Sequence, residues 1–197
     1  MLARSKWKPM NTRVFFVTDV HGSERCFKKF LNAGKFYNAN AVMLAGDITG
    51  KMIVPIVRQP DGTYLSLYAG SEIHCKSEAE VQDLEKSIRD SGFYPYRTDT
   101  AEMESLESDK KKVDHLFTSL MVETVERWVR MAEERLRGTG IKCFVSPGND
   151  DRWEVDSPLK KSDFIVNPEE KVVEVDRDHE MITLGLTNHT PWKSPRE

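Results

Sequence analysis

Cysteine is scarce in this sequence, and no apolar run is long enough to cross a membrane. Its three cysteines, Cys26, Cys75 and Cys143, are an odd number at wide spacing, which is a poor disulfide framework. Cys75 follows a histidine but has no CxxC partner that could complete a structural zinc site. We therefore expect three reduced thiols, two of them buried, in a cytoplasmic protein without a membrane segment.

The sequence also lacks a charge imbalance. Charged residues make up 31% of its 197 residues, yet the formal net charge is only -3, and no basic stripe is interleaved with aromatics. No nucleic-acid-binding surface is therefore indicated. Residues 1–13 carry charge but no apolar core, so we expect no signal peptide. With 39% apolar residues, we expect a single domain over residues 1–197.

Three short apolar runs predict buried strands, at residues 13–18, 40–45 and 141–148. Between the first two runs, Ser23 can cap a helix whose apolar residues recur at helical spacing, and Gly34 is expected to end it. Strand, helix and strand thus fit within about 35 residues, the size of a βαβ unit. The first two strands should then lie parallel.

The segment 51–138 has a different character, and we expect it to form an inserted accessory lobe beside the site. A turn sequence at 59–62 between two apolar runs predicts a β-hairpin. One helix is predicted near 78–91 and one long helix over about 100–137, whose apolar stripe we interpret as a packing surface. Beyond the third strand, a further hairpin is predicted at 171–187.

Each of the three predicted strands ends in a polar cluster. Asp19 and His21 follow the first strand, Asp47 follows the second, and Asn149 and Asp150 follow the third. Sites in parallel α/β sheets form at the carboxyl ends of strands, so these clusters should converge in one crevice. Each cluster alone could be an ordinary cap, turn or loop, but all three in this order favour a site.

The donor types in these clusters predict a metal centre. In an extended segment, residues two apart point the same way, so Asp19 and His21 could bind one ion. The carboxylate of Asp47 could bridge two ions about 3.5–4 Å apart, and the amide oxygen of Asn149 could bind the second. Mixed imidazole, carboxylate and amide donors suit manganese, iron or zinc. The neighbouring glycines would let the backbone turn beside the ions; they are Gly22, Gly46, Gly50 and Gly148.

These blocks resemble the calcineurin-like metallophosphoesterase superfamily. Its Asp-x-His, Gly-Asp-x-x-Gly and Gly-Asn-x-Asp motifs match residues 19–21, 46–50 and 148–151. The insertion and the tail at 187–197 are similar to a prokaryotic, Icc-related branch of that superfamily. The resemblance implies an α/β fold in which two packed mixed β-sheets are flanked by helices, the metallophosphoesterase sandwich.

The same resemblance implies a dinuclear centre with two divalent metal ions, whose bridging hydroxide attacks phosphorus in line. It assigns Asp19 and His21 to the first ion and Asn149 to the second, with Asp47 between them. Many members place a histidine after the asparagine as proton donor to the leaving group. Here that catalytic position holds Asp150, a poor proton donor at neutral pH because a carboxyl group has a pKa of about 4.

The superfamily also supplies later histidine ligands, from a lone histidine after a strand and a Gly-His-x-His block. Neither precedes Glu197, and His189 lies in another context, where we expect a surface position or one beside a ligand. We therefore expect the C-terminal part of the fold to be missing and the second ion to be under-ligated. An open sheet edge could then pair with a second copy in a homo-oligomer.

The sequence thus predicts a metal-dependent phosphoesterase that acts on a small phosphoester, either a phosphodiester or an activated ester. A phosphate-loop interpretation of residues 46–51 fails because the glycine spacing is wrong and Met52 replaces Ser or Thr; a dinucleotide motif is absent. The remaining alternative is a catalytically weak scaffold or binding protein with the same fold. The missing histidines and Asp150 favour that alternative, and the retention of Asp19, His21, Asp47 and Asn149 argues against it.

Overall fold

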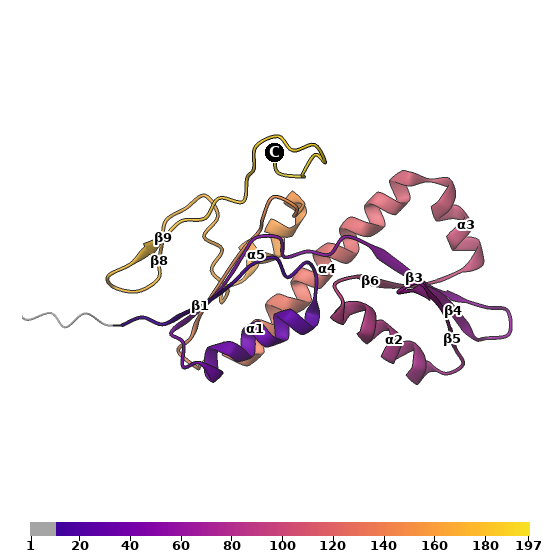
Figure 1. Cartoon of the computed structure of the whole chain (residues 1–197), viewed down its shortest axis with the longest axis horizontal. Helices are drawn as coiled ribbons and strands as arrows, with labels where there is room; N and C mark the ends of the chain where they lie inside the picture. The colour runs from indigo at the N-terminus through magenta and orange to yellow at the C-terminus, as the bar shows by residue number, and fades with distance from the viewer. Residues whose placement is uncertain (1–10) are drawn as a thin grey trace, which may run out of the picture.

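The computed structural model describes residues 11–197, which form an α/β arrangement of three sheets and their flanking helices (Figure 1). The strands are β1 Val14–Val17, β2 Ala41–Ala45, β3 Ile53–Arg58, β4 Tyr64–Tyr68, β5 Ser71–Cys75, β6 Tyr94–Asp99, β7 Lys142–Ser146, β8 Val173–Glu174 and β9 Glu180–Met181. The helices are α1 Glu24–Phe36, α2 Glu78–Asp90, α3 Thr100–Ser108, α4 Lys110–Leu136 and α5 Asp156–Lys161, with a 3-10 turn η1 at Trp153–Val155. The predicted α/β class is confirmed.

The first sheet is wholly parallel, in the order β1-β2-β7. Val17 pairs with Leu44, and Leu44 pairs with Val145, so the three strands finish at the same edge. All three strands were predicted from their apolar runs, and the parallel pairing of β1 with β2 confirms the βαβ unit. This shared edge is where the polar clusters of the sequence come together.

Helix α1 starts where the sequence predicts and ends later. The Oγ of Ser23 accepts a hydrogen bond from the backbone N–H of Cys26 at 3.3 Å, which caps the first turn. The helix then continues through Gly34 to Phe36, so the predicted end at Gly34 is wrong. A Cβ on Gly34 would lie 3.2 Å from Cγ1 of Val42 on β2, so this glycine allows close packing against the sheet.

One face of the first sheet is covered by α1 and the second half of α4. Phe27 and Trp128, both buried, stack with their ring centroids 4.2 Å apart at the centre of this core. Such an aromatic pair contributes roughly 0.5–1.5 kcal/mol beyond the area that it buries. The apolar stripe of α4 is therefore packing surface; its buried members include Met121, Val125, Ala132 and Leu136.

The second sheet, in the order β5-β4-β3-β6, lies with α2 and α3 at the other end of the molecule (Figure 1). It is mixed, since β3 pairs antiparallel with β4 and parallel with β6. The β3–β4 hairpin and α2 were predicted, whereas β5 and β6 were not. Helix α4 runs from this end of the molecule to the first sheet, so the segment 51–138 contributes to both cores (Figure 1). Its status as a separate lobe stays an expectation.

The single long helix expected over 100–137 is wrong, because the chain forms two helices there. Asp109 separates them with a non-helical backbone at φ -137° and ψ 97°. Its carboxylate accepts hydrogen bonds from the backbone N–H groups of Lys111 at 2.9 Å and Lys112 at 3.4 Å. The charged run that begins at Asp109 is thus a helix start, where a capping aspartate competes with helix continuation.

The opposite face of the first sheet is only partly covered. The hairpin predicted at 171–187 is present as the short pair β8–β9, and Val173 and Met181 in this pair pack toward Phe144. Phe16, Ile182 and Leu184 remain 60%, 60% and 66% exposed. The resemblance implied two mixed sheets packed on each other. In the structure the first sheet is wholly parallel, and the second, mixed sheet packs against α2. Sheets flanked by helices agree with the predicted α/β class, and the metallophosphoesterase sandwich itself stays a prediction.

The cysteines agree with the prediction of free thiols. Cys26 is exposed, whereas Cys75 and Cys143 are buried, and all three are unbridged. Burial raises the pKa of the Cys143 thiol to about 12, so this group is an inert core residue at neutral pH. None of the helices in residues 11–197 has the length and apolar composition of a membrane-spanning segment.

Candidate metal centre

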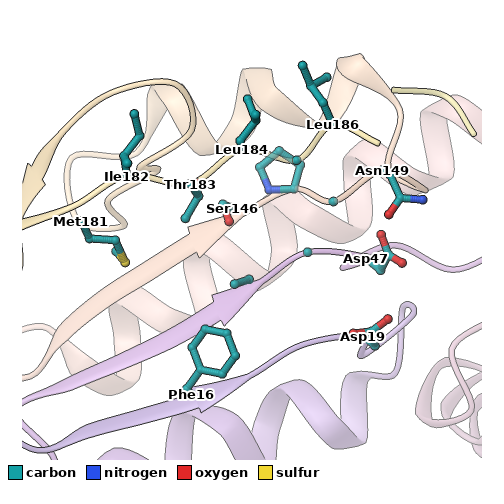
Figure 2. Close-up of a pocket in the computed structure, with 15 residues that line it drawn as sticks. Phe16, Asp19, Asp47, Ser146, Asn149, Met181, Ile182, Thr183, Leu184 and Leu186 are labelled. Atoms are coloured by element: carbon teal, nitrogen blue, oxygen red, sulfur yellow. The ribbon is translucent and has the colours of Figure 1, made fainter. Parts of the chain in front are cut away.

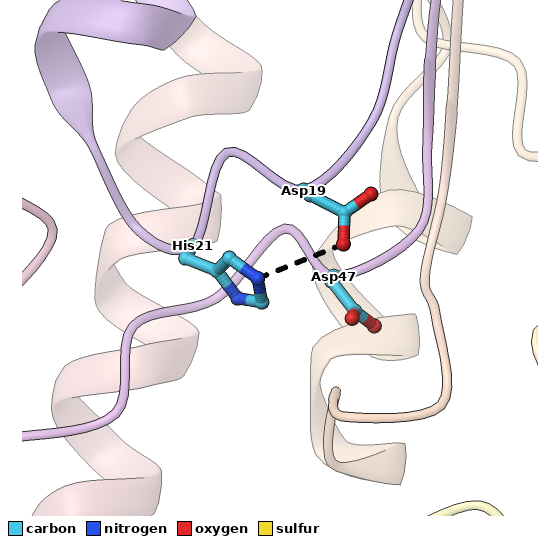
Figure 3. Close-up of side chains that lie close together, drawn as sticks. All are labelled: Asp19, His21 and Asp47. Carbon is cyan, nitrogen blue, oxygen red and sulfur yellow. Dashed lines mark ion pairs between the residues drawn. The ribbon is translucent and has the colours of Figure 1, made fainter.

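Three of the predicted ligands meet just beyond the ends of β1 and β2 (Figure 3). Asp19, His21 and Asp47 each offer one donor atom, and these atoms all lie within 4.8 Å of one another. The Nε2 of His21 is 3.6 Å from Oδ1 of Asp19. Asp19 is exposed, and the other two are half-buried. The three side chains are close enough to share one cation.

The backbone of these three residues is unusual. Asp19, His21 and Asp47 have φ values of 57°, 43° and 49°, in the left-handed region that residues other than glycine rarely adopt. This conformation costs roughly 1–2 kcal/mol per residue. The segment from Asp19 to His21 is therefore not extended, and the predicted reason for their convergence is wrong. Tight left-handed turns bring the donors together, and such strained positions concentrate at functional sites.

Backbone hydrogen bonds hold the two ligand loops side by side. The N–H of Asp19 donates to the carbonyl of Gly46 at 3.2 Å, and the N–H of His21 donates to the carbonyl of Asp47 at 2.9 Å. The N–H of Gly22 also donates to the carbonyl of Ile48 at 2.9 Å. The distance between Asp19 and Asp47 is thus set by the backbone rather than by flexible side chains.

The Asp47 carboxylate lies in an environment that suits a cation. Burial raises its pKa, and the nearby carboxylates of Asp151 and Asp150 act in the same direction. The backbone N–H of Asp150 donates to Oδ1 of Asp47 at 3.1 Å, and that hydrogen bond favours the charged form. A half-buried carboxylate among other carboxylates is stabilised by a bound divalent ion, so the residues present fit a metal.

Asn149 reaches the same edge from the end of β7. In Figure 2 its amide oxygen points toward Asp47. Asp19, Asp47 and Asn149 line one side of a hollow of about 470 Å³. Apolar side chains line much of the rest: Phe16 lies on β1, the strand that leads to Asp19, and Met181, Ile182, Leu184 and Leu186 lie on the segment across from the sheet (Figure 2). The structure thus brings the four predicted ligand positions to one edge of the sheet; whether they bind metal stays a prediction.

Asp151, the last residue of the third motif, holds the ligand loops together. It is fully buried, and its carboxylate accepts hydrogen bonds from the backbone N–H groups of Ile48 at 3.0 Å, Thr49 at 2.8 Å and Gly148 at 2.7 Å. The hydroxyl of Thr49 donates to it as well. A buried carboxylate that accepts several backbone hydrogen bonds joins the Asp47 loop to the Asn149 loop.

Two glycines of the motifs are required by close approach. A Cβ on Gly148 would lie 2.3 Å from both the N and Oδ1 atoms of Asp47. A Cβ on Gly50 would lie 2.1 Å from the carbonyl oxygen of Gly92. The prediction that these glycines allow sharp turns is therefore refined: at both positions the missing side chain makes room for a neighbouring segment.

Asp150, the predicted catalytic residue, lies beside the cluster and forms an ion pair with Lys51. The hydrogen bond to Asp150 raises the pKa of the Lys51 ammonium group. Lys51 directly follows the second motif, so its sequence position was the only signal that could have identified it. The pair places a carboxylate and an ammonium group near Asp47, whose charge also raises the pKa of Lys51.

Tyr94 and His189 show the limits of the sequence interpretation. The phenol oxygen of buried Tyr94, on β6, accepts a hydrogen bond from the N–H of Gly50 at 2.7 Å, and burial raises its pKa. No sequence signal pointed to this contact between the second sheet and a ligand loop.

The His189 side chain is 96% exposed and lies 3.3 Å from Oε2 of Glu197, outside the ligand cluster.

The donors fit the two implied ions unequally. Asp19, His21 and Asp47 form the one cluster of three or more acidic, histidine or cysteine donors in the described residues 11–197. A second ion would have only the other oxygen of Asp47 and the amide of Asn149 from the predicted set.

No family model, no curated protein and no solved structure matches this chain.

Proposed function

We propose that this chain is a metal-dependent phosphoesterase of the calcineurin-like type, with its catalytic edge at the ends of β1, β2 and β7. The observation that carries the proposal is the convergence of Asp19, His21 and Asp47, whose donor atoms lie within 4.8 Å of one another. All three residues are held in strained left-handed conformations. Strained backbone positions concentrate at functional sites, and two carboxylates held close together favour a bound cation.

The ligands have distinct roles in this proposal. Asp19, His21 and Asp47 would hold the first ion, and Asn149 would offer its amide oxygen to a second ion that shares Asp47. Divalent ions at such a site neutralise the charge of phosphoryl oxygens and activate water. The protein supplies the fixed geometry through the backbone hydrogen bonds from Asp19 to Gly46 and from His21 to Asp47.

The surroundings favour phosphodiesters or activated esters over unactivated monoesters. The proton-donor position holds the Asp150 carboxylate, which forms an ion pair with the Lys51 ammonium group. An ionised carboxylate cannot donate a proton to a leaving group, so substrates with good leaving groups are favoured. The apolar wall beside the ligands, which includes Ile182 and Leu184, would contact the organic part of a small phosphoester.

A catalytically weak scaffold is the second candidate. Three observations favour it. Of the predicted ligands only Asn149 and Asp47 would serve a second ion, and Asp150 occupies the proton-donor position. Exposed Phe16, Ile182 and Leu184 beside the site would suit a binding surface. A scaffold would bind metal ions but would not hydrolyse a phosphoester, so a single hydrolysis assay distinguishes it from an enzyme.

The test is hydrolysis of bis-p-nitrophenyl phosphate by the protein loaded with manganese, iron or zinc. We expect metal-dependent release of p-nitrophenol that falls at least about 100-fold in Asp47→Asn, because a neutral amide is a poor bridging ligand. Asp61→Asn, in the exposed turn between β3 and β4, is the matched control and should retain the parent rate. Equal rates in the parent and Asp47→Asn would refute the proposal.

A further inference from the structure

The tail after β9 contacts the loop that carries Asn149. We propose that residues 187–197, the C-terminal strap, position this ligand, and that Ser194 is the positioning residue that orients its amide. This inference rests on the proposed function, since it concerns how the second ion is held. The strap contains no helix or strand, and no ligand motif falls within it.

Ser194 fixes which end of the Asn149 amide faces the site. The Nδ2 of Asn149 donates a hydrogen bond to Oγ of Ser194 at 3.0 Å. The Ser194 hydroxyl in turn lies 3.4 Å from Oδ1 of Asp150 and donates to it. Because the nitrogen is bound to Ser194, the amide oxygen is left to point toward Asp47, as Figure 2 shows. A neutral amide can bind a metal ion only through its oxygen.

Ser194 is itself held in place. It is 8% exposed, and its backbone N–H donates to Oε1 of Glu197 at 2.6 Å. The same Glu197 carboxylate accepts a hydrogen bond from the N–H of Thr190 at 3.0 Å, which closes the turn of the strap. The Ser194 hydroxyl therefore has a fixed position relative to Asn149, as expected of a group that orients a ligand.

Arg196 fastens the strap to the loop after Asn149. Its side chain is fully buried, and its Nε donates to the carbonyl of Asp151 at 2.8 Å. Its Nη2 donates to the carbonyl of Arg152 at 3.1 Å and forms an ion pair with Asp156. Its guanidinium carbon lies 4.4 Å from the ring centroid of Trp153. The backbone N–H of Arg196 also donates to the carbonyl of Asn149 at 3.2 Å.

Together these contacts hold Asn149 from both sides. Its backbone carbonyl is bound by Arg196, and its side-chain nitrogen is bound by Ser194. Groups that hydrogen-bond a metal ligand fix its orientation, and their loss typically lowers metal affinity about 10- to 100-fold. Removing the Ser194 hydroxyl should therefore weaken the ion at Asn149 and leave the ion at Asp19 and His21 unchanged.

The experiment is a zinc titration of the ¹⁵N-labelled 197-residue protein, which follows the Asn149 side-chain amide and the His21 ring separately by NMR. In the parent we expect both groups to shift with added Zn²⁺. In Ser194→Ala we expect His21 to shift at the same Zn²⁺ concentration, whereas Asn149 requires about 10- to 100-fold more. Ser194→Thr keeps the hydroxyl and should restore the parent response.

Ser66→Ala is the matched control, because Ser66 is buried in the second sheet, where its hydroxyl donates to the carbonyl of Pro55. It should leave both responses unchanged. If Ser194→Ala and the parent titrate alike at Asn149, the positioning role is overturned while the proposed function stands. If neither group shifts in the parent, the proposed function fails, and the positioning role fails with it. A Ser194→Ala protein that does not fold would be replaced by Ser194→Gly under the same criteria.

Discussion

The carboxylate of Asp151 accepts a hydrogen bond from the backbone N–H of Thr49 at 2.8 Å, although the two residues are 102 positions apart in the chain. This contact joins the loop after β2 to the loop after β7. It fixes the distance between the loops that carry two predicted ligands, Asp47 and Asn149. The geometry of the candidate centre therefore depends on a residue that is not expected to touch a metal.

Asp151→Asn should destabilise the fold. The amide nitrogen introduced at this position would face backbone N–H donors such as those of Ile48 and Gly148, and a buried unpaired donor costs about 1–3 kcal/mol. We expect the free energy of unfolding to fall by about 3 kcal/mol in urea titrations. Asp163→Asn, an exposed carboxylate paired with Arg137, should change it by less than about 1 kcal/mol. Similar losses in both variants would contradict this account.

Gly148→Ala should damage the site through a direct clash. The added Cβ would lie 2.3 Å from Oδ1 of Asp47, and overpacking of this kind costs about 1–3 kcal/mol. We expect a lower melting temperature and weaker metal binding. Gly62→Ala, in an open turn at φ +85°, should lower the melting temperature through backbone strain alone and bind metal like the parent. If Gly148→Ala bound metal with the affinity of the parent, the predicted link between the position of Asp47 and metal binding would be wrong.

The strap should loosen in acid. Hydrogen bonds from Thr190 and Ser194 lower the pKa of Glu197 to about 2, and the largest contribution comes from the Thr190 hydroxyl. Since this pKa lies below the unfolded value of about 4.3, the stabilisation is complete above about pH 4.3 and is lost as the pH falls toward 2. An NMR titration of the Glu197 carboxyl carbon should have its midpoint near pH 2. Thr190→Val should raise this midpoint, and a midpoint near 4.3 in the parent would contradict the prediction.

Asp150→His should favour poor leaving groups, provided that the chain is an active phosphoesterase. A histidine with a pKa near neutrality can donate a proton, and general acids typically contribute about 10²–10⁴-fold in rate. We expect the ratio of variant to parent rates to increase as the pKa of the leaving group rises. Asp150→Asn, which offers no acid, should show no such trend. A constant ratio across leaving groups for Asp150→His would refute the proton-donor argument.

The first sheet and α1 could be predicted because local signals agree there. The runs that became β1, β2 and β7 are short and apolar, and Ser23 is a strong cap. β5 and β6 lacked such signals, since one is largely polar and the other contains Pro95. The split at Asp109 depends on competition between capping and helix continuation, which periodicity alone does not resolve.

The candidate site could be predicted only as far as its motifs extend. Asp19, His21 and Asp47 were identified from residue types at strand ends, but their left-handed backbone follows from packing between loops and has no sequence signature. Ser194 and Arg196 lie in an irregular segment without periodicity, so their contacts with the Asn149 loop could not be anticipated. The contacts that an irregular segment makes with distant parts of the chain depend on the complete fold.

A calorimetric titration of the metal-free protein with Mn²⁺, compared with Asp19→Asn and Asp47→Asn, tests the central claim most directly. The account predicts tight binding in the parent that weakens at least about 10-fold in each variant, because both carboxylates contribute donors to one ion. Absence of Mn²⁺ binding in the parent, or equal affinity in the parent and Asp47→Asn, would contradict the account.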